Sequence, residues 1–162
     1  ALPIECAQTI SQPFTVAFMT QTLEVKPGDK ILEIGTGSGY QAAVLSKLGA
    51  EVFSVERIEK LYENAGILLD ELGFKVHLKL DDGTLGWEEL APFDKIIVTA
   101  GAPDVPQHLL GQLNTGGKLV IPVGDHDMQR LLVINKTENG IEKKYYDKFK
   151  FVPLIGEEGW KS

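Results

Sequence analysis

The sequence predicts an α/β protein with a Rossmann-like, doubly wound and mostly parallel sheet that ends in a C-terminal antiparallel β-hairpin. Three observations predict this class. Short apolar runs typical of buried strands alternate with segments of helical periodicity. A glycine-rich turn at residues 35–39 directly follows the first of these runs. Near the end of the chain, two β-like runs flank Asn139-Gly140, which is a strong hairpin signal.

Turn-forming residues mark the limits of the first elements. A turn at residues 26–29 precedes residues 30–34, which contain the apolar pair Ile31-Leu32 and are expected to form the first buried strand. Residues 40–48 have a helical pattern that Gly49 ends, and a second strand is expected at 51–55. The order strand, helix, strand predicts that the two strands are parallel.

The helix at 58–72 has the clearest pattern in the chain, and Gly73 ends it. Its apolar residues recur with helical spacing and predict one buried face, formed by Leu61, Ala65, Leu68, Leu69 and Leu72. The rest of the chain continues the alternation. We expect strands at 76–80, 93–99 and 117–123, a short helix at 106–113, and hairpin strands at 130–135 and 141–149.

Composition limits the classes of partner. The 162 residues predict a single domain, residues 1–162, that is long enough for a substantial core. A net charge of −7 disfavours contact with phosphate backbones, so we expect no nucleic-acid partner. The chain has no run of 18 apolar residues, and its single cysteine, Cys6, rules out an internal disulfide. We therefore expect a cytoplasmic monomer that does not bind membranes.

The glycine-rich turn is the most informative motif. Residues 33–39 are Glu-Ile-Gly-Thr-Gly-Ser-Gly, so the spacing is G-x-G-x-G with Glu33 two places before Gly35. Such a turn between a strand and a helix lets the backbone pass close to a ligand. It resembles motif I of the class I S-adenosylmethionine-dependent methyltransferases. A nicotinamide-binding protein, whose fingerprint is G-x-G-x-x-G, and a purely structural turn are the alternatives.

Acidic residues follow the second and third predicted strands. Glu56 lies 21 residues beyond Gly35, where a carboxylate can accept hydrogen bonds from both hydroxyls of a ribose. The alternative is a solvated charge at the start of a helix. In Asp81-Asp82-Gly83, a carboxylate can accept a hydrogen bond from an adenine amino group, and the glycine lets the backbone approach the ring. The alternative here is an ordinary Asp-Gly turn.

Glu33 lies inside the first predicted strand, where a buried carboxylate needs a partner. The cationic methionine end of S-adenosylmethionine would supply one. A structural lysine or arginine is the alternative.

Seven ordered segments together resemble the protein-L-isoaspartate O-methyltransferases and extend over nearly the whole chain. They are residues 9–13, 32–43, 55–57, 82–83, 91–100, 116–124 and 151–154. The first segment, Thr9-Ile10-Ser11-Gln12-Pro13, and the last, Phe151-Val152-Pro153-Leu154, are not general methyltransferase motifs. They make the resemblance specific to this family.

The resemblance implies the class I methyltransferase fold and an activity. Members transfer a methyl group from S-adenosyl-L-methionine to the free α-carboxylate of L-isoaspartyl residues in damaged proteins and peptides, and S-adenosyl-L-homocysteine is the product. The methyl ester collapses to a succinimide that hydrolyses partly to normal aspartate, which makes the function protein repair. The α-carboxylate is already ionised at pH 7, so the reaction needs no general base and no metal. We therefore assign no catalytic role to His77, His108 or His126.

The resemblance also implies the site residues. Ser11 is the residue that the family pattern marks as catalytic, because its hydroxyl can donate to the substrate carboxylate. Spacing alone favours Ser11 as the N-cap of the helical stretch that runs to residue 23, and one hydroxyl can serve both roles. The expected substrate-binding residues are Thr9, Ile10, Ala100, Gly101, Ala102, Val152, Pro153 and Leu154. The expected cofactor-binding residues are Glu33, Gly35, Thr36, Gly37, Ser38, Gly39, Glu56, Arg57, Asp81, Asp82, Gly83 and Thr99.

Three features depart from the family pattern. Asp81 replaces the first glycine of the usual Gly-Asp-Gly, Glu5-Cys6-Ala7 replaces a glycine-rich stretch, and the usual N-terminal helical segment is lacking. The missing segment and Asp81 keep open a non-catalytic member that binds the cofactor or damaged proteins. A methyltransferase for small molecules or nucleic acids and a nicotinamide oxidoreductase are further alternatives. The acidic charge opposes the nucleic-acid alternative, and the glycine spacing opposes the oxidoreductase.

Overall fold

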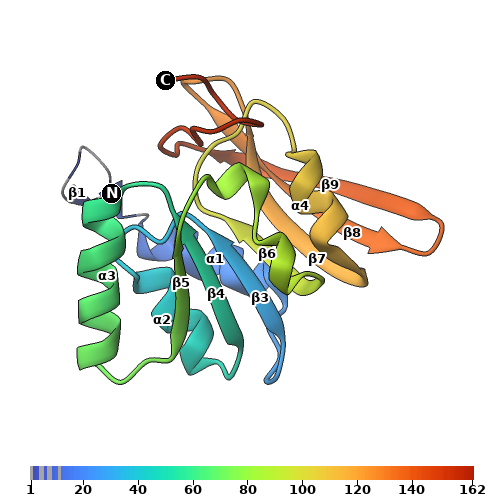
Figure 1. Ribbon diagram of the computed structural model, residues 1–162. Coiled ribbons are helices and arrows are strands. Elements are labelled where there is room, and N and C mark those ends of the chain that lie inside the picture. The colour runs from blue at the N-terminus through green and yellow to red at the C-terminus, as the bar shows by residue number, and fades with distance from the viewer. Residues whose placement is uncertain (1, 4–5, 7–8, 11) are drawn as a thin grey trace.

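The computed structural model describes residues 2–3, 6, 9–10 and 12–162 and has the predicted α/β architecture (Figure 1). A seven-stranded sheet has the order β5-β4-β3-β6-β7-β8-β9. Its strands are β3 (Lys30–Ile34), β4 (Glu51–Glu56), β5 (Val76–Leu80), β6 (Phe93–Val98), β7 (Leu113–Gly124), β8 (Gln129–Thr137) and β9 (Gly140–Phe149). β3 to β7 pair in parallel, whereas β8 and β9 are antiparallel to their neighbours. The predicted parallel sheet and its C-terminal hairpin are confirmed.

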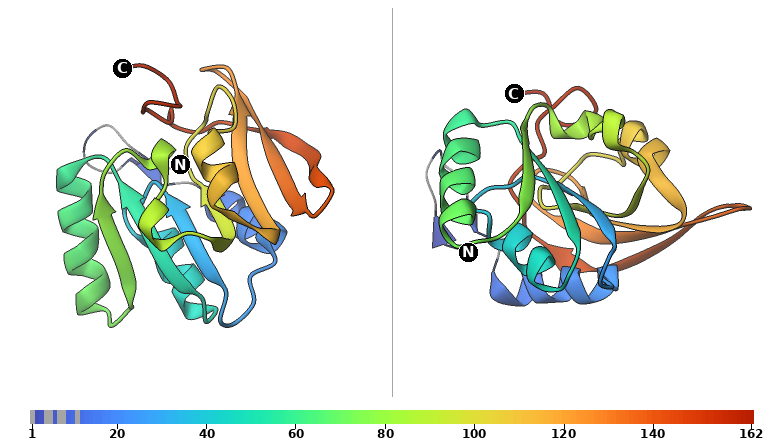
Figure 2. Two further views of the ribbon diagram at one scale, coloured as in Figure 1. Left: turned by 45° about the vertical axis from the view of Figure 1, so that its right-hand side comes forward. Right: turned by 60° about the horizontal axis from the view of Figure 1, so that its bottom comes forward.

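Helices cover both faces of this sheet, as Figure 2 shows. On one face, Met19, Leu45 and Leu69 pack against the sheet residues Ile31 and Val52. These three side chains belong to α1 (Pro13–Leu23), α2 (Tyr40–Lys47) and α3 (Glu59–Glu71). The other face is covered by α4 (Gln107–Gln112) and by the 3-10 turns η1 (Gly83–Leu85) and η2 (Glu88–Leu90). Within the described part of the chain, no helix is long and apolar enough to cross a membrane.

A second, two-stranded sheet lies near the N-terminus and was not predicted. It pairs β1 (Leu2–Pro3) with β2 (Thr9–Ile10) in antiparallel register. Each strand has only two residues, so a sequence pattern of strand alternation cannot be recognised there.

Two details of the predicted helices are wrong. Leu68 and Leu72, expected on the buried face of α3, are 45% and 61% exposed. The buried residues of that helix are Leu61, Ala65 and Leu69, which follow an i, i+4, i+8 row. A helix over the edge strands of a sheet needs only this narrow row, so the neighbouring i+3 positions face solvent.

The start of α1 differs by one residue from the predicted N-cap. The N-cap position is Gln12, and Pro13 occupies the first helical turn, where its missing N–H leaves no intrahelical bond unmade. Gln12 makes no side-chain capping hydrogen bond. The interpretation of Ser11 as the N-cap is therefore wrong, and Ser11 itself lies outside the described residues.

Candidate functional site

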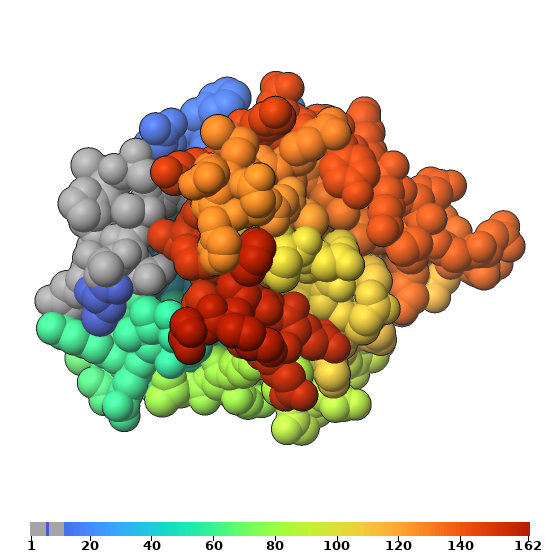
Figure 3. All heavy atoms as spheres, turned by 90° about the horizontal axis from the view of Figure 1, so that it is seen from above, coloured from blue at the N-terminus to red at the C-terminus, as the bar shows by residue number. Residues whose placement is uncertain are grey.

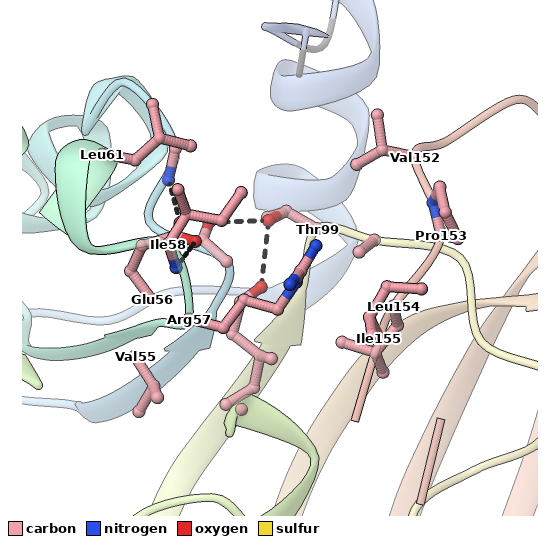
Figure 4. A pocket seen from close by; sticks show the side chains of 15 residues that line it. Val55, Glu56, Arg57, Ile58, Leu61, Thr99, Val152, Pro153, Leu154 and Ile155 are labelled. Atoms are coloured by element: carbon pink, nitrogen blue, oxygen red, sulfur yellow. Dashed lines mark hydrogen bonds between the residues drawn. The ribbon is translucent and has the colours of Figure 1, made fainter. Parts of the chain in front are cut away.

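A cleft opens at the carboxyl ends of β3, β4 and β6, where β3 has β4 on one side and β6 on the other. Doubly wound sheets bind ligands at this point because the connections leave it in opposite directions. The cleft contains about 590 Å³ and is open to solvent. Figure 4 shows the segment from Val55 to Leu61 on one side of it and Val152 to Ile155 on the other. It is lined by Ile34, Gly35, Gly37, Val55, Glu56, Arg57, Ile58, Leu61, Gly83, Thr99, Ala100, Val152, Pro153, Leu154 and Ile155.

The glycine loop that follows β3 forms part of the cleft wall. Gly35, Gly37 and Gly39 have φ angles of 94°, 54° and 86°, in the left-handed region that favours glycine. A Cβ atom on Gly35 would lie 2.6 Å from Thr99 Oγ1. Gly35 and Gly37 line the cleft, whereas Gly39 is the N-cap of α2. The backbone conformation therefore requires glycine at these alternate positions, and at Gly35 and Gly37 the backbone itself faces the cleft.

Glu56, at the end of β4, is a preorganised hydrogen-bond acceptor in the cleft. Its Oε2 accepts from the N–H of Gly37 at 2.9 Å, and its Oε1 accepts from the N–H of Ile58 at 3.0 Å. The residue is only 6% exposed and precedes the start of α3. It is not the solvated helix-start charge that was the alternative. Each carboxylate oxygen keeps a further acceptor position, as two ribose hydroxyls would require.

Glu33 is fully buried and does not line the cleft. Ser54 Oγ donates to Glu33 Oε1 at 2.6 Å, and Thr36 Oγ1 lies 2.6 Å from Ser54 Oγ, so three buried side chains form a chain. The pKa of Glu33 is raised to about 8, mainly by burial and also by the charge of Glu56, while the Ser54 hydrogen bond opposes the rise. Oε2 has no hydrogen-bond partner among the residues that the structure describes.

This environment corrects the structural alternative for Glu33, which was a lysine or arginine partner. Among the described residues, the hydrogen-bond partner is instead the hydroxyl of Ser54. A neutral hydroxyl suffices because a carboxyl group with a raised pKa is mostly protonated at neutral pH. The predicted contact with the cationic end of the cofactor stays a prediction.

Thr36 and Ser38, which alternate with the glycines, hold the loop and do not line the cleft. Thr36 is buried and is joined to Ser54 as described. Ser38 Oγ accepts from the N–H of Tyr40 at 3.3 Å, in the first turn of α2.

The three residues after β5 have different environments. Asp81 is exposed and pairs with the ammonium of Lys79 at 2.9 Å. The hydrogen bond from Lys79 lowers the pKa of Asp81, and the N–H of Asp82 contributes in the same direction. Asp81 does not have the positive φ angle that would favour glycine, so an aspartate fits this backbone. Of the three residues, only Gly83 lines the cleft.

Asp82 joins this loop to the C-terminal segment. Its Oδ1 accepts from the N–H and the hydroxyl of Thr84 at 2.9 and 2.7 Å, which caps η1. Its Oδ2 accepts from the N–H of Glu157 at 2.7 Å. The carboxylate is thus engaged in three protein hydrogen bonds, and its contact with an adenine amino group stays a prediction.

Thr99 and Arg57 both line the cleft but differ in how firmly they are held. Thr99 Oγ1 lies 3.0 Å from the carbonyl of Ile34 and 2.8 Å from that of Gly35, and it donates to them. This bond ties the end of β6 to the start of the glycine loop. Arg57 is exposed at the mouth of the cleft.

The predicted substrate-binding segments after β6 and near the C-terminus lie side by side. The N–H of Gly101 donates to the carbonyl of Val152 at 2.7 Å, and the N–H of Leu154 donates to the carbonyl of Gly101 at 2.8 Å. The indole N–H of Trp160 donates to the same carbonyl at 3.1 Å. Figure 3 looks down on this end of the molecule, where the red C-terminal residues lie across the centre. The segments form an isolated parallel bridge rather than the end of an edge strand.

Of these segments, Ala100 and residues 152–154 line the cleft directly. Ala102 lies behind, where its N–H donates to the carbonyl of Pro122 at 2.9 Å and its carbonyl accepts from Gly124. Thr9 and Ile10 form β2, and Ser11 lies outside the described residues.

The sequence interpretation missed the apolar walls of the cleft. Val55, Ile58 and Leu61 line it on the side of Glu56, and Ile155 lines the other side. Leu61 was expected only as a core residue of its helix. Their position in the sequence could have indicated this role. Ile58 and Leu61 closely follow Glu56 at the end of a strand, where an adenine ring would lie.

Together these features define a class of protein. The doubly wound sheet, the alternate-glycine loop after β3 and the buried carboxylate after β4 are those of the class I S-adenosylmethionine-dependent methyltransferases. A family model, Protein-L-isoaspartate(D-aspartate) O-methyltransferase (PCMT), matches residues 1–159. The chain therefore belongs to the protein-L-isoaspartate(D-aspartate) O-methyltransferase family.

Individual relatives agree with this assignment. The chain is 56% identical over 161 residues to the protein-L-isoaspartate O-methyltransferase of Chlorobaculum tepidum, covering 99% of this chain and 76% of that protein. A solved protein-L-isoaspartate O-methyltransferase superposes with a TM-score of 0.88 at 31% identity, over 98% of this chain and 52% of the other. A PCMT structure from Plasmodium falciparum in complex with S-adenosyl-L-homocysteine has a TM-score of 0.84 at 28% identity, over 95% and 79%. This chain thus spans about half of the first solved structure.

Proposed function

We propose that this chain transfers a methyl group from S-adenosyl-L-methionine to the free α-carboxylate of L-isoaspartyl residues in damaged proteins and peptides. The observation that carries the proposal is a cleft with two unlike walls. One wall has the glycine loop and Glu56, whose carboxylate is held by two backbone N–H groups. The other has Ala100 and residues 152–154, whose backbone is bonded across to Gly101. Membership of the family supports the substrate class.

The described residues fit S-adenosylmethionine. Glu56 offers acceptors to a ribose, Ile58 and Leu61 offer an apolar surface to an adenine, and the glycine loop lets a methionine moiety approach the backbone. Glu33 Oε2 is the unpartnered buried oxygen that a cationic amino group near the loop would satisfy. When bound, the cofactor supplies the methyl group on a sulfonium centre, and S-adenosylhomocysteine remains.

The task left to the protein is placement rather than proton transfer. An α-carboxylate with a pKa of about 4 is ionised at neutral pH, so its oxygen is already nucleophilic. The walls have to hold that oxygen in line with the methyl group and keep water out. No imidazole lines the cleft in the described part of the chain, which agrees with a reaction that needs no general base.

Ser11 is proposed as the catalytic residue that donates a hydrogen bond to the substrate carboxylate. The support is its place in Thr9-Ile10-Ser11-Gln12-Pro13, directly before α1. A hydroxyl donor that holds one carboxylate oxygen leaves the other oriented for attack.

The test is transfer of a labelled methyl group from S-adenosylmethionine to an isoaspartyl peptide, with the matched aspartyl peptide as control. Selective labelling of the isoaspartyl peptide supports the proposal, and equal labelling of both peptides overturns the substrate class. Ser11→Ala should lose most of the activity and keep cofactor binding. Ser46→Ala in α2, a serine outside the cleft, is the matched control and should retain activity.

The alternative is a member that binds the cofactor or damaged proteins without turnover. One argument for this alternative, Asp81 in place of glycine, is weakened because the backbone at Asp81 does not require glycine. Binding of S-adenosylhomocysteine without any labelling of the isoaspartyl peptide would favour this alternative.

We further propose that the chain acts as a monomer in the cytoplasm and does not bind nucleic acid. The net charge of −7, which repels phosphate backbones, supports the lack of nucleic-acid binding. Sedimentation of the protein alone and with duplex DNA or RNA tests the oligomeric state and the nucleic-acid binding. A concentration-dependent dimer, or binding that falls steeply with salt, would overturn them.

A further inference from the structure

Gln129, at the start of β8, is a buried side chain that joins three segments near the substrate side of the cleft. It is only 2% exposed. Its Oε1 accepts from the N–H of Phe151 at 2.8 Å, and its Nε2 donates to the carbonyl of Asp125 at 2.5 Å. One amide group thus fixes both the turn before β8 and the residue that begins the 151–155 segment.

The same side chain lies against Gly101. A Cβ atom on Gly101 would come within 2.7 Å of Gln129 Cδ and 2.8 Å of its Cγ. Because Gly101 in turn bonds to Val152, Leu154 and Trp160, its position determines where the 151–155 segment lies. Gln129 therefore packs against Gly101 and holds Phe151, the first residue of the 151–155 segment, by a hydrogen bond.

The turn that Gln129 fixes also has hydrogen bonds of its own. Asp125 Oδ1 accepts from the N–H groups of Asp127 and Met128, each at 2.9 Å. These bonds lower the pKa of Asp125. The ring of His126, from the same turn, lies against that of Trp160 with a centroid distance of 3.7 Å and an interplanar angle of 31°. The turn, Gly101 and the C-terminal segment thus form one connected unit.

We propose that Gln129 is a positioning residue that sets the geometry of the substrate wall and thereby the affinity for the isoaspartyl peptide. This inference rests on the proposed function, because it assumes that Ala100 and residues 152–154 face the acceptor. Gln129 itself does not line the cleft, so it acts through the backbone it holds. Within the described part of the chain, the side-chain hydrogen bonds of Gln129 go to Asp125 and Phe151 and not to the wall with Glu56 and the glycine loop.

The chain offers a matched control for this role. Gln112, in α4, is also buried and bridges two backbone groups, because its Nε2 donates to the carbonyl of Leu85 and its Oε1 accepts from the N–H of Trp87, both at 2.9 Å. It packs against Gly86 as Gln129 packs against Gly101. Its two hydrogen bonds hold the loop between η1 and η2, and neither of them is made to residues 151–155. Loss of either glutamine removes the same chemistry at a different place.

The experiment compares Gln129→Met and Gln112→Met with the wild type. Methionine keeps the length of the side chain and removes both hydrogen bonds. Gln129→Met should raise the KM for an isoaspartyl peptide about tenfold and change the Kd for S-adenosylhomocysteine by less than about twofold. It should also speed amide exchange at Phe151 and Leu154. Gln112→Met should lower Tm without a selective rise in the peptide KM.

The proposal would be overturned if Gln129→Met raised the peptide KM and the cofactor Kd by the same factor. It would also be overturned if Gln112→Met raised the peptide KM as much as Gln129→Met does. If Gln129→Met does not fold, Gln129→Glu is used, which keeps an acceptor for Phe151 and loses the donor to Asp125. The peptide KM should again rise by a larger factor than the cofactor Kd, and an unchanged KM would overturn the proposal. If the wild type binds S-adenosylhomocysteine but does not methylate the peptide, the proposed function fails. Peptide Kd and amide exchange in the same variants then decide the role of Gln129 separately.

Discussion

Replacing Glu33 with glutamine should remove a pH dependence of folding stability that the buried carboxyl group imposes. Burial raises the pKa of Glu33 to about 8 in the folded protein, against an ordinary value of 4.5. Between these values the folded protein keeps a proton that the unfolded chain has lost. The free energy of unfolding therefore falls as pH rises through this window, and the loss is complete above the folded pKa.

The magnitude follows from the two pKa values. A difference of one between folded and unfolded pKa corresponds to about 1.4 kcal/mol, so the full loss is about 5 kcal/mol. At pH 7 about 3 kcal/mol of this has been lost. Glutamine keeps a carbonyl oxygen as acceptor for Ser54 Oγ and places an uncharged NH₂ where the protonated carboxyl has its O–H. The variant should therefore retain its stability as pH rises.

The assay is denaturant unfolding, followed by tryptophan fluorescence, at steps of pH between 4.5 and 8. The wild type should lose stability relative to Glu33→Gln across this range. Glu63→Gln, an exposed glutamate of α3, should follow the wild type and controls for the change in net charge. Parallel pH profiles for the wild type and Glu33→Gln would refute the reasoning.

Three further predictions concern the cleft and the C-terminal turn. Glu56→Ala leaves two backbone N–H groups unpaired, so calorimetry with S-adenosylhomocysteine should show a Kd at least about tenfold higher, and an unchanged Kd would contradict the role of this carboxylate. Gly35→Ala should lower Tm and cofactor affinity, because the φ of Gly35 is 94° and a Cβ there would lie 2.6 Å from Thr99 Oγ1. Gly111→Ala, in open space on α4, is the control and should be neutral or stabilising. Equal effects of the two substitutions would contradict the prediction. The ion pair between His108 Nδ1 and Glu158 Oε1, at 2.9 Å, should stabilise the turn that contains Glu158 most strongly at mildly acidic pH. The hydrogen bond and charge of Glu158 raise the pKa of His108, so this stabilisation is lost as pH rises above that value. Burial acts to raise the pKa of Glu158, but the bonds from His108 lower it overall, so stabilisation is also lost as pH falls. Proteolysis of this turn should be slowest between the two pKa values in the wild type, and flat with pH in His108→Gln; the same profile in both would contradict the prediction.

The strands and most helix limits were predictable because they depend on neighbours in sequence. The runs at residues 30–34 and 93–98 are mostly Ile, Leu, Val and Phe, as strands buried on both faces require. The ends of α2 and α3 coincide with the turns at Gly49 and Gly73 within one or two residues. The hairpin at Asn139-Gly140 follows from local turn chemistry in the same way.

The errors concern surroundings that a local pattern does not contain. Leu68 and Leu72 have the spacing of a core face, but their exposure depends on where α3 lies over the sheet. The partner of Glu33 depends on β4 pairing beside β3, which brings Ser54 next to it. The apolar cleft residue Ile58 was missed for the same reason.

The sequence by itself determined the order of strands and helices, the alternate glycines after the first strand and the carboxylate after the second. Hydrophobic period and backbone φ are properties of a few consecutive residues, so they can be inferred from a short segment. Only the tertiary structure decided which partner each buried polar group has. Ser54 reaches Glu33 across 21 residues, Phe151 reaches Gln129 across 22, and Glu157 reaches Asp82 across 75. Such bonds form because strand pairing and the return of the C-terminal segment bring distant residues together, and no local pattern encodes that closure.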